Sequence, residues 1–389
     1  MKIGIISADG WLRYWDNYGS LFQNLALQTY LQKEGHETFL IRNTGNRRPF
    51  IWRILAFFYR NKNIFAIPEK FRRKKEEKLF AKFNKKHPRY FEDFMSKNLP
   101  RTEHIFTEKE LLENPPVAEV YIVGSDQMWG CLSIATSLDF APKKALRIAY
   151  AVSTAWKTRT NKWYKSAEKL LPKFDAISVR EPEGIDVVKK TPFKNPVHVC
   201  DPTLLLDKED YMKFVFAENK DLAFPQKTIL AYFLNVKSLD ELPWKETLKL
   251  SKDYNSALKV IPLQGTELCV PEEYVFTPSP TEWLNAYDKS ECVITNSFHG
   301  TAFAIIMRKQ FLVILQKGKT ESENCRFLSI LEKLGLESRI YSENNGTMYE
   351  QMRIPINWKS IEEKLKNFRN FSMQFLSKSL NIKSSRFHE

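Results

Sequence analysis

The chain has 389 residues, is 43% hydrophobic and 13% aromatic, and carries a formal net charge of +14. This length exceeds what one hydrophobic core usually serves, so we expect two domains, and the sequence holds neither a run of 18 apolar residues nor a signal-peptide pattern. Five widely spaced cysteines without a CxxC pair argue against a disulfide framework or a zinc site, and we expect a cytoplasmic protein.

The first residues alternate between strand and helix patterns. Lys2–Ser7 is predicted to be a buried strand, Gly19–Glu34 a helix and Thr38–Arg42 a second strand. Such a unit implies a parallel sheet. The loop that leads to Asn17 and Gly19 would then lie at the carboxyl edge of the sheet, where ligands bind. It lacks the GxGxxG pattern of a dinucleotide site.

A basic segment follows. Residues 50–90 hold thirteen Lys or Arg against three Glu, and Phe50–Arg60 is aromatic and apolar, within a predicted helical insertion over about residues 50–97. We favour a solvated insertion whose apolar face packs on its own domain. The alternative is a peripheral contact with an anionic membrane, on the inner face of the membrane for a cytoplasmic protein. We expect no nucleic-acid binding, because no zinc finger, RNP motif or basic zipper is present.

Three further strands of the first half end in polar residues. The strands are predicted over Val120–Val123, Ile148–Ser153 and Ala176–Val179, with a helix over Asn161–Phe174. The strand ends bring Asp126, Gln127 and Arg180 toward one rim. Simpler interpretations stay open: Asp126 could close a turn or cap a helix, and Arg180 could pair with Glu181.

A second series of strands and helices follows the predicted strand Val197–Cys200. Its strands are predicted over Thr228–Leu234, Leu258–Leu263, Cys292–Thr295 and Phe311–Leu315, and its helices over Leu242–Lys252, Thr281–Lys289, Phe298–Arg308 and Arg326–Leu334. We therefore predict two doubly wound α/β domains, over residues 1–210 and 211–354. Asp207–Gln226 is the expected linker, and a helix over Trp358–Leu380, within residues 355–389, is expected to pack back on the first domain.

The junction within Cys292–Ile306 is the most informative stretch. An apolar strand ends there at Thr295 and an apolar helix begins at Phe298, which leaves backbone N–H groups unpaired and favours an anion. His299 would place a titratable donor beside that anion. Gly300 would let the ligand approach the backbone, while Ser297 and Thr301 offer hydroxyls. The alternative is that His299 caps the helix or bonds a carbonyl.

Several motifs together resemble the polysaccharide pyruvyl transferase family. They are NYGSLFQNLALQTYL from Asn17, GSDQMW from Gly124, SVRE from Ser178, CDPTLLL from Cys200, ITNSFHGTAFAI from Ile294 and NCRFLSILEKLGL from Asn324. The resemblance implies two Rossmann-like domains that face each other across a cleft, as in glycosyltransferase-B folds. It also implies transfer of pyruvate from phosphoenolpyruvate to a sugar of a surface polysaccharide, which forms a ketal and releases phosphate.

By this resemblance, His299 and Arg180 correspond to donor-binding and catalytic positions, with His299 as the general acid. Asp126 is the candidate acceptor contact or base. The substrate-binding candidates are Asn17, Gly19, Gln127, Ser297, Gly300, Thr301, Lys317, Asn324 and Arg326, with Lys319 as an alternative to Lys317. The first loop departs from the family pattern, since Asp16 to Ser20 is bulky and aromatic there, which affects the acceptor side.

The implied partners are phosphoenolpyruvate and a glycan that is carried on a lipid. No cofactor or metal is implied, although magnesium stays open. Two other functions compete with pyruvyl transfer. One is a glycosyltransferase that uses a nucleotide sugar on the same scaffold, and the other is a non-catalytic protein that binds glycans or membranes.

Overall fold

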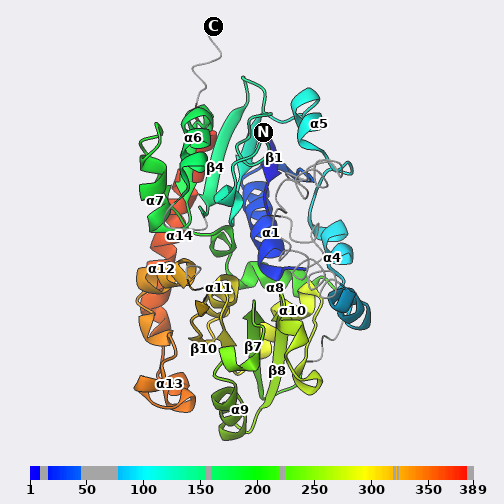
Figure 1. Cartoon of the computed structure of the whole chain (residues 1–389), viewed down its shortest axis with the longest axis vertical. Coiled ribbons are helices and arrows are strands. Elements are labelled where there is room, and N and C mark those ends of the chain that lie inside the picture. Colours follow the sequence, from blue (N-terminus) through cyan, green and yellow to red (C-terminus); the bar gives the residue numbers. More distant parts are fainter. Residues whose placement is uncertain are drawn as a thin grey trace, which may run out of the picture.

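The computed structural model describes residues 1–8, 16–44, 78–154, 159–218, 222, 224–318, 321 and 324–382. These residues form two parallel sheets, each covered by helices, in two lobes. Figure 1 shows the first lobe, with β1 (Lys2–Ile6) and β4 (Leu146–Val152), above the second, with β7 (Thr228–Leu234) and β8 (Ala257–Leu263). The predicted α/β fold with two Rossmann-like units is confirmed. The exact domain boundaries stay a prediction.

The first sheet has the order β2-β1-β3-β4-β5-β6, and all its pairs are parallel. The second has the order β10-β9-β7-β8 and is also parallel. The remaining strands are β2 (Glu37–Leu40), β3 (Val120–Val123), β5 (Ala176–Val179), β6 (Val197–His198), β9 (Cys292–Thr295) and β10 (Gln310–Val313). The central strands are buried on both faces, as continuous apolar runs predict.

The helices for which a range was predicted lie close to that range. Those of the first lobe are α1 (Tyr18–Lys33), α4 (Phe91–Asn98), α5 (Glu108–Glu113), α6 (Asn161–Leu170) and α7 (Pro182–Lys189). Those that follow are α8 (Lys208–Phe216), α9 (Trp244–Asp253), α10 (Pro280–Lys289), α11 (Phe298–Ile306), α12 (Cys325–Leu334), α13 (Met348–Arg353) and α14 (Trp358–Leu380). Of these, α5, α7, α8 and α13 had no predicted range. The predicted helix over Asn161–Phe174 is shorter, because a three-ten turn over Leu171–Lys173 follows α6.

Helix α1 contacts β2 of the first lobe and α11 of the second, and it is buried on nearly all sides. Its buried residues include the polar Gln23, Asn24 and Gln28 as well as apolar ones, so the helix needs partners on every face. Phe22 supplies them toward the second lobe, since its ring centroid lies 5.3 Å from that of Phe303 and 5.2 Å from that of Trp283. Because this packing joins the lobes, it fixes the start of α1 against the second lobe.

The predicted linker over Asp207–Gln226 is wrong for its first half. Helix α8 occupies that half, with Asp207 as its N-cap and Tyr211, Met212 and Val215 buried. The apolar residues at helical spacing in this charged stretch were the signal that the linker interpretation overlooked.

Helix α14 packs back on the first lobe as predicted, and it contacts both lobes (Figure 1). On the first lobe, Arg369 donates to the carbonyl of Leu204 at 2.6 Å, and the Ser372 hydroxyl accepts from the backbone N–H of Cys200 at 2.9 Å. On the second, Lys364 donates to the carbonyl of Leu334 at 3.0 Å. This helix therefore ties the lobes together on the side opposite α4.

The basic segment lies mostly outside the described residues, which resume at position 78. Its described end contacts the second lobe, where Arg89 donates to the carbonyl of Pro262 at 2.9 Å and Lys86 pairs with Glu272 at 2.6 Å. The expectation that the apolar face of the insertion packs on its own domain concerns Phe50–Arg60, which lies outside the described residues, so it stays a prediction. The membrane contact through residues 50–90 stays a prediction.

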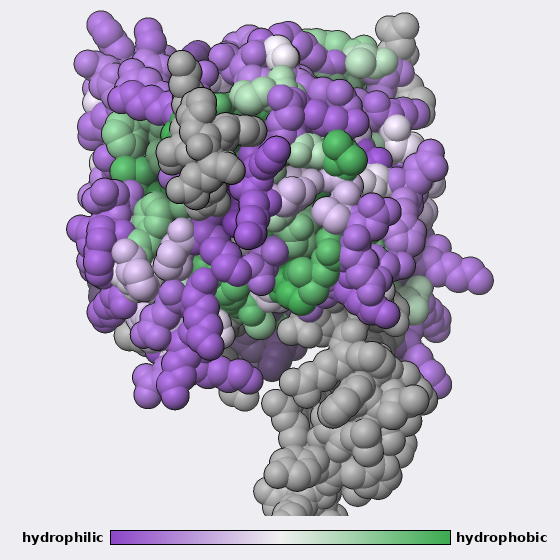
Figure 2. Space-filling model, turned by 90° about the horizontal axis from the view of Figure 1, so that it is seen from above, coloured by the Kyte–Doolittle hydropathy of each residue, from purple (hydrophilic) through white to green (hydrophobic). Residues whose placement is uncertain are grey.

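Viewed from above, the described surface is mostly hydrophilic, with hydrophobic residues in small patches (Figure 2). Among the described residues, no helix combines the length and the apolar composition that crossing a membrane requires.

Candidate functional site

Arg180 is the centre of a buried charged network at the carboxyl end of β5. Its Nε donates to Glu181 at 2.8 Å, its Nη1 donates to Asp201 at 3.0 Å, and its Nη2 lies 3.4 Å from Asp126. The guanidinium is 1% exposed and stacks over the Phe298 ring, 4.5 Å from its centroid. Burial opposes its charge, but the three carboxylates raise the pKa of Arg180, so it stays a cation.

Asp201 follows β6 and is fixed by hydrogen bonds to both carboxylate oxygens. Oδ1 accepts from the backbone N–H of Thr203 at 3.0 Å and from its hydroxyl at 2.8 Å. Oδ2 accepts from the Ser125 hydroxyl at 3.0 Å and from Arg180. Burial alone would raise the pKa of Asp201, but His299, Arg180 and the Thr203 N–H outweigh it and hold the pKa well below its usual range.

Asp126 lies at the opening of this network. Its backbone φ is +66°, in the left-handed region that aspartate tolerates in turns, and its side chain is 16% exposed. Burial raises the pKa of Asp126, but Arg180, His299 and Arg326 lower it below the usual value. The strand-end prediction therefore brings Asp126 and Arg180 together, with Gln127 half-buried beside them at the start of a three-ten turn.

His299 lies in the first turn of α11, where the second lobe meets the first. The residue is 7% exposed, and its Nε2 is buried without a hydrogen-bond partner in the described part of the chain. Nε2 lies 3.8 Å from Oδ2 of Asp201, which is too long for a hydrogen bond. A Cβ on Gly19 would lie 2.1 Å from Nδ1, so Gly19 leaves the space that the ring occupies. The imidazole is therefore held between two elements of the first lobe.

Gly300 allows a close approach, but to protein and not to a ligand. A Cβ there would lie 2.2 Å from the Thr295 hydroxyl oxygen and 2.8 Å from the Tyr232 ring. The missing Cβ at Gly300 therefore serves packing within the protein, and a contact of its backbone with substrate stays a prediction. Its role is to let α11 pack onto β9 and β7.

We expect Gly300→Ala to lower the free energy of unfolding by about 1–3 kcal/mol, because the added methyl overpacks the core between α11 and the second sheet. Urea unfolding followed by circular dichroism measures this difference. Unchanged stability would show that α11 can shift without cost.

Three predicted substrate contacts serve helix starts in the structure. Oδ1 of Asn17 accepts from the Ser20 N–H at 3.1 Å and caps α1, and the Ser297 hydroxyl accepts from the Gly300 N–H at 3.3 Å and caps α11. The Thr301 hydroxyl donates to the carbonyl of Ser297 at 2.9 Å. These groups fix the two helix N-termini that face each other at His299.

The loop after β10 supplies the remaining candidates. Asn324 exchanges two hydrogen bonds of 2.9 Å with the backbone of Gln316, so its amide closes the loop. Arg326 follows in the first turn of α12 and lies near enough to lower the pKa of Asp126. Lys317 is described, whereas Lys319 lies outside the described residues.

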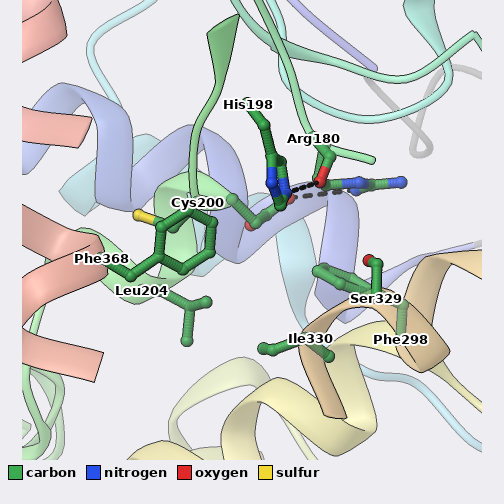
Figure 3. Close-up of a pocket in the computed structure, with 9 residues that line it drawn as sticks. Arg180, His198, Cys200, Leu204, Phe298, Ser329, Ile330 and Phe368 are labelled. Carbon is green, nitrogen blue, oxygen red and sulfur yellow. Dashed lines mark hydrogen bonds and ion pairs between the residues drawn. The ribbon is translucent and has the colours of Figure 1, made fainter. Parts of the chain in front are cut away.

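A narrow hollow lies beside this network (Figure 3). Its lining residues come from both lobes and α14 and are Arg180, His198, Cys200, Asp201, Leu204, Phe298, Ser329, Ile330 and Phe368. The His198 ring bonds the carbonyl of Arg180 at 3.0 Å, as the dashed line shows. His299 is not among the lining residues, so this hollow is a packing void behind Arg180 and not the candidate site.

The neutral state of His198 gives a testable pH dependence. Burial, with a contribution from Lys333, lowers the pKa of His198 to about 4, whereas the unfolded chain has a value of about 6.5. The unfolded state therefore binds more protons between these values, and the free energy of unfolding should fall by up to about 3 kcal/mol as the pH drops from about 6.5 to about 4. Urea unfolding across this range should show a flatter dependence in His198→Gln, and an identical slope would contradict this account.

Asp201 lies in the CDPTLLL motif but was not predicted as a site residue. The signal was present, because Asp201 follows a strand end in the same way as Asp126 and Arg180. Glu181 was considered as a partner of Arg180, and the structure confirms that pair while adding two further carboxylates. Within the described ranges, no group of three His, Cys, Asp or Glu residues is placed to hold a metal ion.

Two parallel α/β lobes, with charged residues at the strand ends where they meet, define a GT-B-like protein with an interlobe site. Comparison with protein families then places it: the chain belongs to the polysaccharide pyruvyl transferase family, whose model matches residues 17–317. This membership makes the protein a transferase and implies a polysaccharide acceptor. Among curated proteins, none is significantly similar to the chain.

One solved structure, with a TM-score above 0.5, supports the fold. A UDP-N-acetylglucosamine 2-epimerase from Rickettsia bellii is similar over 100% of both chains, with a TM-score of 0.52 and 12% identity. The UDP-GlcNAc 2-epimerase from Neisseria meningitidis has a TM-score of 0.43 and 13% identity over 97% of this chain and 100% of its own. The wall teichoic acid polymerase TagF has a TM-score of 0.46 and 10% identity over 97% of this chain and 89% of its own. At these identities the likeness concerns the fold alone.

Proposed function

We propose that this protein transfers pyruvate from phosphoenolpyruvate to a sugar of a surface polysaccharide or of its lipid-linked precursor. The observation that carries the proposal is the position of His299. Its imidazole is buried where the lobes meet, at the N-terminus of α11, and its Nε2 has no hydrogen-bond partner among the residues that the structure describes. A proton donor next to an anion-binding helix start is what the carbon of an enol phosphate requires.

The donor site is built on the first turn of α11. The leading N–H groups of a helix have no partner within the helix, so those of Phe298 and His299 suit the phosphate or the carboxylate of the donor. Arg326 and Lys317, from the neighbouring loop and α12, supply cationic charge on the same side. The guanidinium of Arg180 is already engaged by carboxylates. We therefore assign Arg180 to holding the site together through its charge and its stacking on Phe298.

The proposed reaction balances without an added acid or oxidant. His299 gives a proton to the methylene carbon, whose double-bond electrons form the new C–H bond, and the central carbon accepts the first sugar hydroxyl. The second hydroxyl then displaces phosphate from the same carbon and closes the ketal. Of the two hydroxyl protons, one restores His299 and one leaves on the phosphate. Cationic groups around the leaving phosphate stabilise its charge.

In this proposal, residues of the first lobe bind the acceptor sugar. Asp126 is partly exposed at the network's opening and Gln127 lies next to it, so both face the side from which a sugar hydroxyl would approach. The lowered pKa of Asp126 keeps it ionised, which suits hydrogen-bond acceptance from a hydroxyl better than removal of its proton. Oδ1 of Asn17 is occupied by its bond to the Ser20 N–H, so Asn17 fixes the start of α1 on this side.

Thermal unfolding with different ligands separates pyruvyl transfer from the glycosyltransferase and the binding protein. Thermal unfolding should shift upward with phosphoenolpyruvate and not with UDP- or GDP-sugars, because a ligand that binds the native state raises the transition. Preference for a nucleotide sugar would favour the glycosyltransferase. A shift with neither, together with vesicle flotation that depends on residues 50–90, would favour the binding protein.

A further inference from the structure

The two ring nitrogens of His299 lie in different surroundings. Nε2 is buried and lies on the side of Asp201, 3.8 Å from its Oδ2. Nδ1 lies on the side of Gly19, where a Cβ would come within 2.1 Å of it. A neutral imidazole in such a setting carries its single proton on the nitrogen that has the better hydrogen-bond acceptor beside it.

Asp201 is the carboxylate that can supply this acceptor. Of the described acidic residues, it is the one with an oxygen within 4.0 Å of a ring nitrogen of His299, whereas Asp126 and Glu181 form ion pairs with Arg180. It is completely buried and is oriented by Thr203, Ser125 and Arg180, so its position does not depend on His299. A hydrogen bond requires the gap to shorten by only about 0.6–1 Å.

We propose that Asp201 is the positioning residue of His299: its carboxylate accepts a hydrogen bond from Nε2–H, which leaves Nδ1, beside Gly19, as the atom that delivers a proton to the donor substrate. This inference rests on the proposed function. The carboxylate keeps the ring in one orientation and stabilises the doubly protonated form that acts as the acid.

This assignment determines where each proton goes during the reaction. Before the step, the ring carries protons on Nε2 and Nδ1. The Nδ1–H bond breaks as the C–H bond of the new methyl group forms, and its electron pair returns to Nδ1. The ring, a cation before the step, is then neutral with its remaining proton on Nε2, facing Asp201. A proton from the first sugar hydroxyl then restores Nδ1, and Asp201 stays ionised throughout.

The direct test is the tautomer of His299 by NMR. The ¹⁵N-histidine spectrum of the full-length protein is recorded over a pH series, the His299→Ala protein assigns the signal, and the tautomer is determined from the spectra in which that ring is neutral. We expect the pattern of an Nε2–H tautomer in the wild-type protein. In Asp201→Asn, the amide can donate to Nε2, so we expect the Nδ1–H tautomer to gain population. A wild-type ring protonated on Nδ1 would overturn the proposal.

Kinetics provide a second test, with Glu181→Gln as the matched control. Each substitution replaces one buried carboxylate that pairs with Arg180. Only the Asp201 carboxylate also lies near the His299 ring. Asp201→Asn should lower kcat about 100-fold with a KM for phosphoenolpyruvate changed by less than about threefold, and should raise the solvent deuterium isotope effect on kcat. Glu181→Gln should leave the isotope effect unchanged.

An equal rise of the isotope effect in both variants would contradict a specific role of Asp201. If Asp201→Asn does not fold, the wild-type tautomer still decides the question. The outcomes are also distinguishable from failure of the proposed function. A wild-type protein that neither binds nor turns over phosphoenolpyruvate refutes pyruvyl transfer, whereas an active wild type with the Nδ1–H tautomer refutes the role of Asp201 alone.

Discussion

Replacing His299 by alanine should lower kcat for pyruvyl transfer by about 10²–10⁴-fold, the usual contribution of a positioned general acid. The protein should remain folded. The imidazole is buried, but its Nε2 has no hydrogen-bond partner among the described residues. Removing the ring deletes a buried unsatisfied polar group, which stabilises the fold, and some packing contacts, whose loss destabilises it. The two changes in the free energy of unfolding offset each other. Phosphate release from phosphoenolpyruvate in the presence of an acceptor measures the loss.

His104→Ala is the control for this variant, because His104 is 58% exposed and pairs with Glu110 away from the site. It should keep wild-type activity. Thermal unfolding of both variants checks that each is folded. If His299→Ala retains activity within about threefold of wild type while folded, the role of His299 as the acid is refuted.

Gly19→Ala should abolish activity nearly as completely as the loss of His299 itself. The added methyl would lie 2.1 Å from Nδ1 and 2.5 Å from the neighbouring ring carbon, closer than real contacts allow. Either the ring rotates away or α1 moves apart from α11, and each response separates the proton donor from the donor substrate. A misplacement of about 1 Å costs about 10²-fold in rate.

Gly35→Ala is the matched control for the glycine substitution. No atom lies within 4 Å of a Cβ at Gly35, although its φ of +83° disfavours a side chain. We expect Gly35→Ala to cost about 1 kcal/mol in stability and to leave kcat unchanged. Activity measured at a temperature where both variants are folded separates the two effects. Wild-type activity in Gly19→Ala would show that the ring does not need its present position.

The sequence predicts the fold of this protein well because its strands are short, apolar and separated by helices with clear ends. Val120–Val123, Ala176–Val179, Thr228–Leu234 and Cys292–Thr295 were predicted to the residue. The linker interpretation failed at α8, since a high density of charge concealed the few apolar residues on its buried face. Composition alone does not distinguish a charged linker from a helix with one buried side.

The candidate site is only partly predictable for a different reason. The rule that polar residues gather at the carboxyl ends of parallel strands brought Asp126 and Arg180 together. No such rule identifies which glycine leaves room for which side chain. Gly19 was proposed as a substrate contact and lies against His299, while Gly300 was expected to face a ligand and faces Thr295. These contacts join residues far apart in the chain, and they depend on how the lobes and layers meet.

The most direct test of the central claim is the fate of phosphoenolpyruvate in heavy water. The protein is incubated with phosphoenolpyruvate and galactosyl, mannosyl or glucosaminyl acceptors in D₂O, and the glycan is analysed by mass spectrometry and proton NMR. We expect phosphate release together with a pyruvate ketal whose methyl group carries deuterium, and neither in His299→Ala. Phosphate release without a ketal on any acceptor, or the same deuterated ketal from His299→Ala at an undiminished rate, would contradict the account.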